Sequence, residues 1–166
     1  WIRKYQPSEL QIGIESGDDR MLNVMGKRFT SKEAGKVLQE LSEHRIRVCG
    51  LFLIGYPTEN ESSLNSTLEF IRLHKKHMSS IWISYYQPVY GTVGYDMAVA
   101  RNGGRLMQPK LNTEITYIDP DLSETLLTEY KMRMIKAFSP PLWKRYLYRL
   151  SPGLVRTIKT LTRSDN

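Results

Sequence analysis

The sequence predicts an α/β fold in which three parallel strands are joined by helices. Three short apolar runs alternate with amphipathic segments, in the order strand, helix, strand, helix, strand, helix. Such alternation is typical of parallel strands linked by right-handed crossovers. The composition, 40% hydrophobic and 25% charged, is that of a globular domain. No apolar run reaches the roughly 18 residues that would span a bilayer.

The first unit begins with LQIGI at 10–14, whose β-branched residues favour a strand. The turn residues Ser16 to Asp19 end it. Thr30 and Glu33 have the spacing of a capping box, which predicts that a helix begins there. Apolar residues recur on one face of this helix, at Ala34, Val37, Leu38 and Leu41.

The second unit begins with VCGLFLI at 48–54, a continuous apolar run that favours a strand buried on both faces. Gly55 and Pro57 end this strand. Thr58 and Glu61 predict a second capping box, followed by a helix that runs to about His77.

The third strand is predicted at 81–86 (IWISYY), with a short helix at about 93–102. Residues 104–120 show no period and are interpreted as a linker, with a short strand at 115–118. A helical pattern follows Pro120, and Ser139-Pro140 and Ser151-Pro152 favour two further helix starts. We therefore divide the chain into a domain at 1–103, a linker at 104–120 and a helical region at 121–166.

The positive charge gathers at the end of the chain. The net charge is +7, and residues 131–166 hold nine lysines and arginines against one acid. Such a basic region attracts the phosphates of nucleic acid or of an anionic membrane surface, or it is a solvated helix face. We expect four apolar side chains in it to pack on the body of the domain: Leu142, Tyr146, Leu147 and Leu150.

The carboxyl ends of parallel strands share one rim, where functional residues gather. Glu15 follows the first strand, where its carboxylate either accepts hydrogen bonds from a vicinal diol such as a ribose or caps the next helical turn. Gly50 and Gly55 either let a flat ring approach the main chain or serve a bulge and a turn. Lys27 either meets a carboxylate or is solvated. Metal ligands are not expected, because the chain has a single cysteine, Cys49.

Three segments in order resemble the C-terminal half of the radical S-adenosylmethionine (radical SAM) fold. They are GIESGDDRML at 13–22, LFLIGYPTENESS at 51–63 and QPVYGT at 87–92. The family pattern reads roughly GvESGdd, then G-x-P-g-E, then P-x-P-G-T. The resemblance is closest to the cobalamin-binding subgroup, which includes enzymes like magnesium-protoporphyrin monomethyl ester cyclase. Residues 130–150 also resemble the helical end of that subgroup.

The resemblance implies the second half of a partial (β/α)6 barrel, related to the TIM barrel, followed by a helical tail. It implies an enzyme in which a [4Fe–4S] cluster, fed by an external electron donor, reductively cleaves S-adenosylmethionine. The resulting 5′-deoxyadenosyl radical then modifies a small-molecule substrate of unknown identity, by methylation, cyclisation or a related reaction. Cobalamin is a further cofactor that the subgroup implies, bound upstream.

The resemblance also assigns roles to seven residues of this chain. Glu15 holds the ribose hydroxyls, Lys27 meets the methionyl carboxylate, and the main chain around Gly55 lies beside the adenine. The full set of cofactor-binding residues that it implies is Glu15, Ser16, Lys27, Leu53, Gly55, Tyr56 and Pro57. Thr58 and Tyr90 depart from the family pattern, which has Gly and Pro at these positions.

The family holds its cluster with a CxxxCxxC loop, which this chain lacks. The chain is therefore either a truncated piece or a degenerate relative, and two features favour truncation: Trp1 in place of an initiator Met and a first strand without an upstream partner. The missing N-terminal half would carry the cluster, and the fragment alone would be inactive. The alternatives are a methylthiotransferase-like RNA modifier and a non-catalytic binding module with a basic tail. The absence of a signal pattern favours the cytoplasm.

Overall fold

The computed structural model describes residues 7–102 and 116–139. Strands β1 (Leu10–Glu15), β2 (Val48–Ile54) and β3 (Ser80–Tyr85) form one parallel sheet in the order β1-β2-β3. The three predicted strands are confirmed to within a residue at each end. The described strands form an open sheet, so the α/β class is confirmed while the barrel stays a prediction.

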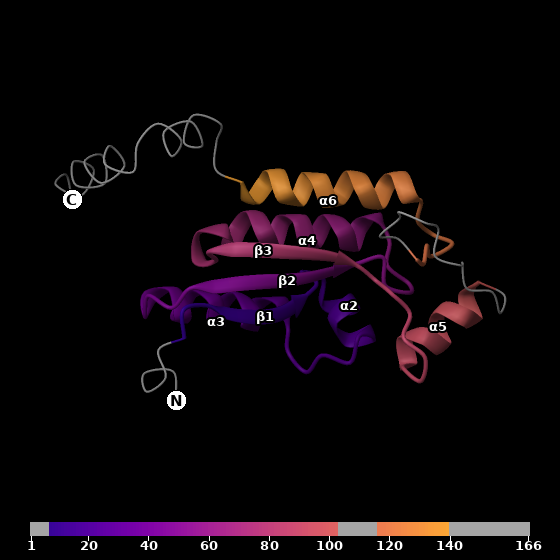
Figure 1. Cartoon of the computed structure of the whole chain (residues 1–166), viewed down its shortest axis with the longest axis horizontal. Coiled ribbons are helices and arrows are strands. Elements are labelled where there is room, and N and C mark those ends of the chain that lie inside the picture. The colour runs from indigo at the N-terminus through magenta and orange to yellow at the C-terminus, as the bar shows by residue number, and fades with distance from the viewer. Residues whose placement is uncertain (1–6, 103–115, 140–166) are drawn as a thin grey trace.

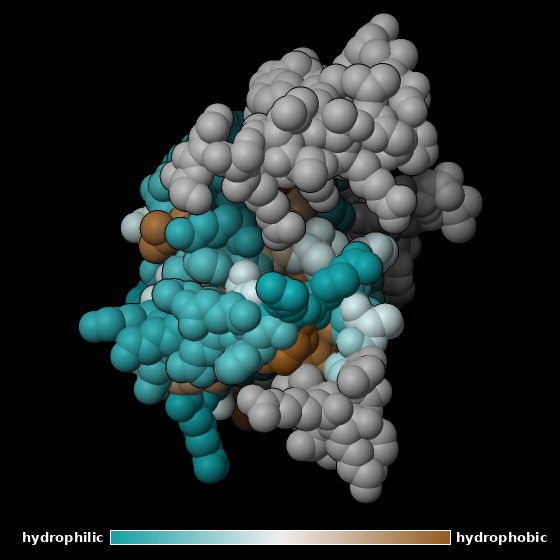
Figure 2. Space-filling view, turned by 90° about the vertical axis from the view of Figure 1, so that its left-hand side faces the viewer, coloured by the Kyte–Doolittle hydropathy of each residue, from teal (hydrophilic) through white to brown (hydrophobic). Residues whose placement is uncertain are grey.

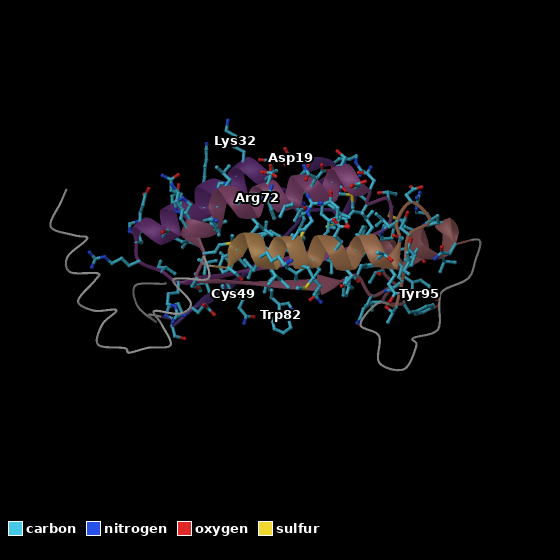
Figure 3. All side chains as sticks on the ribbon, turned by 90° about the horizontal axis from the view of Figure 1, so that it is seen from above. Asp19, Lys32, Cys49, Arg72, Trp82 and Tyr95 are labelled. Carbon is cyan, nitrogen blue, oxygen red and sulfur yellow. The ribbon has the colours of Figure 1, made fainter. Side chains whose placement is uncertain are left out.

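The main helices cover one face of this sheet (Figures 1 and 3). They are α3 (Ser31–Glu43), α4 (Glu61–His74), which continues into a 3-10 turn at Lys75–His77, and α6 (Glu124–Phe138). Helix α6 packs against α4 and β3. Buried side chains from the sheet and these helices form the core, among them Phe52, Ile54, Leu38, Leu64, Leu68, Ile71, Leu127 and Met134.

Two short helices lie toward the carboxyl ends of the strands (Figure 1). Helix α5 (Val93–Arg101) was predicted, and the Thr92 side chain caps it. Helix α2 (Asp19–Val24) was missed, because six residues show no clear apolar period. Asp18 caps α2 by accepting a hydrogen bond from the Met21 amide at 3.0 Å. The cap of this helix is therefore Asp18 rather than Glu15.

The helix starts confirm one predicted capping box and correct the other. Thr30 and Glu33 exchange the two expected hydrogen bonds at the start of α3. The box predicted for Thr58 and Glu61 is wrong, because Asn60 caps α4 and pairs with Ser63. Thr58 has a φ of 72° and belongs to the preceding turn, so it cannot start the helix.

The other face of the sheet is not covered by α3, α4 or α6. Gly13, Leu51 and Trp82 lie side by side in the register of the three strands on this face. Trp82 is 66% exposed, the largest exposed aromatic side chain within the sheet's described strands. The uncovered face is thus a surface that other parts of the protein or a ligand can contact.

The amino ends of the strands form the opposite end of the molecule from the rim. Figure 2 views this end and shows a mostly hydrophilic surface among the coloured residues. No helix in the described ranges is long and apolar enough to cross a membrane.

Thr116–Ile118 do not form the strand that was predicted there. The helices predicted after Ser139, with Leu142, Tyr146, Leu147 and Leu150, lie outside the described residues.

Candidate functional site

Glu15 and Lys27 form an ion pair at the carboxyl end of β1. The Lys27 Nζ atom donates a hydrogen bond to Glu15 Oε1 at 3.1 Å. Their side chains are 25% and 30% exposed, so both charged groups remain accessible at the rim. The structure therefore brings together the two charged residues that the sequence singled out for a diol and a carboxylate.

The main chain at Glu15 aims its carboxylate back over the sheet. Glu15 has a φ of 67°, a left-handed conformation that costs a non-glycine residue roughly 1–2 kcal/mol, and the register with β2 shifts between Gly13 and Glu15. A Cβ atom at Gly13 would lie 2.6 Å from Glu15 Oε1. The glycine two residues before the acid is thus needed for the carboxylate to occupy this position.

Ser16, by contrast, lies in the interior. It is fully buried, and its hydroxyl lies 3.1 Å from the Thr67 hydroxyl of α4 and accepts a hydrogen bond from the Asp18 amide. The Thr67 hydroxyl also accepts from the Gly17 amide at 3.0 Å. These bonds hold the turn after β1 on α4, so Ser16 fixes the position of Glu15 rather than reaching the rim surface.

The end of β2 and the turn after it hold the other four predicted cofactor-binding residues, Leu53, Gly55, Tyr56 and Pro57. Gly55 has a φ of 83°, and a Cβ atom added there would lie 3.4 Å from a methyl group of Leu127 on α6. Its missing side chain therefore serves the turn and the approach of α6, and a flat ligand would have to meet the main chain from the other side. Tyr56 and Pro57 are buried, and Leu53 is partly buried.

A cluster of tyrosines lies under the rim between β2, β3 and α5. The Tyr56 and Tyr86 rings lie 4.7 Å apart, and Tyr86 meets Tyr117 edge-on at 5.8 Å. Leu53 packs against this cluster. Burial raises the pKa of both Tyr56 and Tyr86, so these phenols stay neutral at physiological pH. The cluster forms a rigid support beside the β2 turn.

Glu59 is a fully buried acid behind that turn. One carboxylate oxygen accepts a hydrogen bond from the Gly55 amide, while Oε1 has no partner among the described residues. Burial raises the pKa of Glu59 to about 8, against the lowering effect of the Gly55 and Tyr56 amides. Glu59 is therefore largely protonated at neutral pH, and it braces the turn from inside rather than facing the rim.

Asp119 is a buried charge that sequence reasoning missed. Its carboxylate accepts two hydrogen bonds from the Arg101 guanidinium, at 2.6 and 2.8 Å, and one from the Tyr117 hydroxyl at 2.9 Å. Burial alone would raise the pKa of Asp119, but the bonds from Arg101 and the nearby amides hold it below its usual value. The segment interpreted as a linker thus fastens α5 to the rim.

Asp119 also reaches the β2 turn through Thr58. The Thr58 amide donates to Asp119 at 3.0 Å, and the Thr58 carbonyl accepts from the Arg20 guanidinium at 3.1 Å. Thr58 is β-branched and has a φ of 72°, a conformation that is unfavourable for such a residue. The radical SAM family pattern has Gly at this position. Hydrogen bonds on both sides of the residue hold this strained turn in place.

The residues present fit S-adenosylmethionine better than they fit a metal cluster. Glu15 and Lys27 offer an acceptor for hydroxyls and a cation for a carboxylate at one accessible rim. Cys49 is buried, and the described ranges hold no group of three or more potential metal-ligating side chains. His74 and His77 lie near one another, but His74 packs on Phe70.

The comparisons with known proteins point to one enzyme class. No family model matches the chain. It is 33% identical over 92 residues to a tRNA-2-methylthio-N(6)-dimethylallyladenosine synthase of Klebsiella pneumoniae and 29% identical over 92 residues to one of Buchnera aphidicola. It is also 26% identical over 86 residues to an uncharacterized protein of Methanocaldococcus jannaschii.

These alignments cover about half of this chain, 54% for the two synthases and 52% for the archaeal protein. They span about a fifth of each relative's own length: 19% of the Klebsiella synthase, 20% of the Buchnera synthase and 17% of the Methanocaldococcus protein. The similarity is thus confined to one part of larger proteins. The chain is a distant homologue of these methylthio-adenosine synthases. The homology supports a relationship of the chain to the radical SAM superfamily but not to its cobalamin-binding subgroup.

Proposed function

We propose that this chain forms the S-adenosylmethionine-binding half of a radical SAM enzyme. The observation that carries the proposal is the accessible Glu15–Lys27 pair at the carboxyl rim of a parallel sheet. The distant homology to the synthases supports it independently. A carboxylate and an ammonium at such a rim match the diol and the carboxylate of S-adenosylmethionine.

Each residue then has a distinct role. Glu15 would accept hydrogen bonds from the ribose hydroxyls, and the Lys27 ammonium beside it would pair with the methionyl carboxylate. The main chain from Leu53 to Tyr56 lies beside the adenine, supported from below by the tyrosine cluster. Ser16 and Pro57 act indirectly, by holding the two turns.

When bound, S-adenosylmethionine would supply radical chemistry toward a substrate. The iron–sulfur cluster that this chemistry requires would need ligands from outside this chain, because a single buried cysteine cannot hold it. The chain's own contribution is to bind and orient S-adenosylmethionine. An N-terminal half of the same protein and an external electron donor are the partners that this role requires.

Modification of an RNA base is the second candidate function, within the same superfamily. It is favoured by the two relatives, which are tRNA-2-methylthio-N(6)-dimethylallyladenosine synthases. The net charge of +7 suits a polyanionic substrate. The cobalamin-binding subgroup and its small-molecule substrates, a cytoplasmic location, and a binding module that meets nucleic acid or a membrane through its basic tail stay predictions.

The test uses the full-length protein that carries this chain, purified and reconstituted without oxygen. With a strong reductant and S-adenosylmethionine, we expect 5′-deoxyadenosine and methionine as products. Adding a tRNA pool and analysing its nucleosides by mass spectrometry then tests for base modification. A cluster-loaded protein that forms no 5′-deoxyadenosine would refute the proposed enzyme class, and cleavage without any tRNA modification would refute the RNA candidate.

A further inference from the structure

A groove of about 380 Å³ runs between the free edge of β3 and helix α6. Because β3 is the last strand of the sheet order, nothing described pairs with its outer edge. The groove is lined by Ile81 to Tyr85, Gln87, Lys131 and Ile135. Its volume lies within the range of small-molecule sites, roughly 300–1,000 Å³.

Trp82 presents a large aromatic surface at the mouth of this groove. Its side chain projects away from α6 and α4 (Figure 3) and is 66% exposed. The indole Nε1–H donates a hydrogen bond to the Ser84 hydroxyl at 3.0 Å, which limits rotation of the ring. An exposed tryptophan ring is a surface on which a planar group can stack.

Polar groups stand beside this aromatic surface. Gln87 is exposed, and in the described part of the chain its amide has no hydrogen-bond partner, so it is able to donate and accept at once. The Lys131 ammonium lies 4.2 Å from the centre of the Tyr85 ring and places a positive charge on the groove wall. The Trp82 ring thus lies on the open side of the β3 edge and the Lys131 cation on the α6 side, with the Gln87 amide following the end of the strand.

We propose that this groove binds an unpaired nucleobase of an RNA, stacked on Trp82 and contacted by the Gln87 amide. The proposal rests on the RNA candidate of the proposed function. A base has two flat faces that stack on an aromatic ring, and an adenine edge matches a Gln amide through one donor and one acceptor. Trp82 lies on the same uncovered sheet face as Gly13, whose neighbour Glu15 marks the S-adenosylmethionine rim.

A protein strand is the other kind of molecule that a free sheet edge can bind. Such a strand would pair with main-chain groups of β3 and would not require an aromatic ring at residue 82. The nucleobase is favoured because the most exposed groups of the groove, Trp82 and Gln87, suit a planar heterocycle. The two occupants differ in what they require of residue 82, and this difference is measurable.

The experiment measures binding of a short unstructured adenine-rich RNA to the full-length protein by fluorescence anisotropy. Trp82→Phe keeps an aromatic ring and is expected to bind within a few-fold of wild type. Trp82→Leu keeps an apolar side chain without a ring and is expected to bind about 5- to 150-fold more weakly. Leu73→Ala changes an equally exposed apolar residue on the helical side and is expected to have no effect.

Photo-crosslinking of a 4-thiouridine-substituted RNA to the wild-type protein gives a readout that needs no variant. We expect crosslinks on the peptide that contains Trp82. Equal RNA affinity of Trp82→Leu and wild type, absence of RNA binding, or crosslinks confined to other peptides would each overturn the proposal. The affinity for S-adenosylmethionine, measured on the same proteins, separates failure of the proposed function from failure of this site. If the wild-type protein does not bind S-adenosylmethionine, the proposed function is refuted. If it does bind, and Trp82→Leu binds RNA as wild type does, only this site is refuted.

Discussion

Lys27 and Glu15, 12 residues apart in the sequence, meet through one hydrogen bond of 3.1 Å at the carboxyl end of β1. Both side chains remain a quarter to a third exposed. Exposed ion pairs stabilise a fold by only about 0–1 kcal/mol. The pair therefore contributes little to folding, while its two charges stand where a ligand can reach them.

Replacing Lys27 by Met should weaken S-adenosylmethionine binding without unfolding the protein. Loss of a hydrogen bond to a charged group is worth roughly 1.5–3 kcal/mol, about 10- to 150-fold in affinity. Isothermal titration of the full-length protein measures this change. Lys32→Met, an exposed lysine of α3, is the matched control and should bind normally. Equal affinities of the two variants would remove Lys27 from the site.

Asp119→Ala should destabilise the fold. The substitution leaves the Arg101 guanidinium, the Tyr117 hydroxyl and the Thr58 amide without their shared acceptor. Arg101 is 29% exposed and keeps Asp121 as a partner, so the cost comes mainly from the unpaired Tyr117 hydroxyl and Thr58 amide, about 1–3 kcal/mol. Urea denaturation measures the free energy of unfolding. Asp121→Ala removes the exposed acid that also pairs with Arg101, and a cost above about 1 kcal/mol for it would contradict our distinction between the two acids.

Because the pKa of Glu59 is raised on folding, the protein should lose stability as the pH rises from about 4.5 to about 8. This pKa is about 8 in the folded state and near 4.5 in the unfolded chain, so between these values the folded protein keeps a proton that the unfolded chain releases. The contribution is complete below pH 4.5. It falls by about 1.4 kcal/mol for each pH unit up to about 8, then levels off.

Denaturation of wild type and Glu59→Gln at pH 5, 7 and 9 tests this slope. The glutamine variant cannot ionise, so its free energy of unfolding should decline less steeply over this range. Glu69→Gln alters an exposed acid of α4 and should keep the wild-type slope. Parallel curves for Glu59→Gln and wild type would show that Glu59 is ionised in the folded protein.

The 166-residue chain alone should bind no iron–sulfur cluster. It has one cysteine, and that cysteine is buried in β2. Anaerobic reconstitution with iron and sulfide should leave the purified chain colourless. A stoichiometric [4Fe–4S] absorbance would contradict the assignment of the cluster ligands to another part of the protein.

The sequence predicted the sheet well because the signals are local. The continuous apolar run at 48–54 and the Thr30–Glu33 spacing each define an element without reference to the rest of the chain. Helix α2 was missed because its start depends on a single Asp18 cap. The Thr58 cap was wrong because a distant residue, Asp119, holds Thr58 in the turn.

The part of the candidate site that lies in a sequence motif could be predicted from the sequence. Glu15 stood out by its place after a strand and Lys27 by its charge in the matching segment, and the structure brings them together. The Arg101–Asp119 pair and the groove beside Trp82 gave no local signal, because they join elements that only the fold places side by side. Ser16, also named by the motif, is buried, and its distance from the rim surface could not be read from the sequence.

The affinity of Glu15→Ala for S-adenosylmethionine, measured by isothermal titration on the full-length protein, tests the central claim most directly. If Glu15 holds the ribose hydroxyls, its loss should weaken binding about 10- to 150-fold, the equivalent of roughly 1.5–3 kcal/mol, with the fold intact by circular dichroism. Glu9→Ala, an acid that pairs with Arg47 at the other end of the sheet, should bind normally. An unchanged dissociation constant for a folded Glu15→Ala would contradict the claim that this rim binds S-adenosylmethionine.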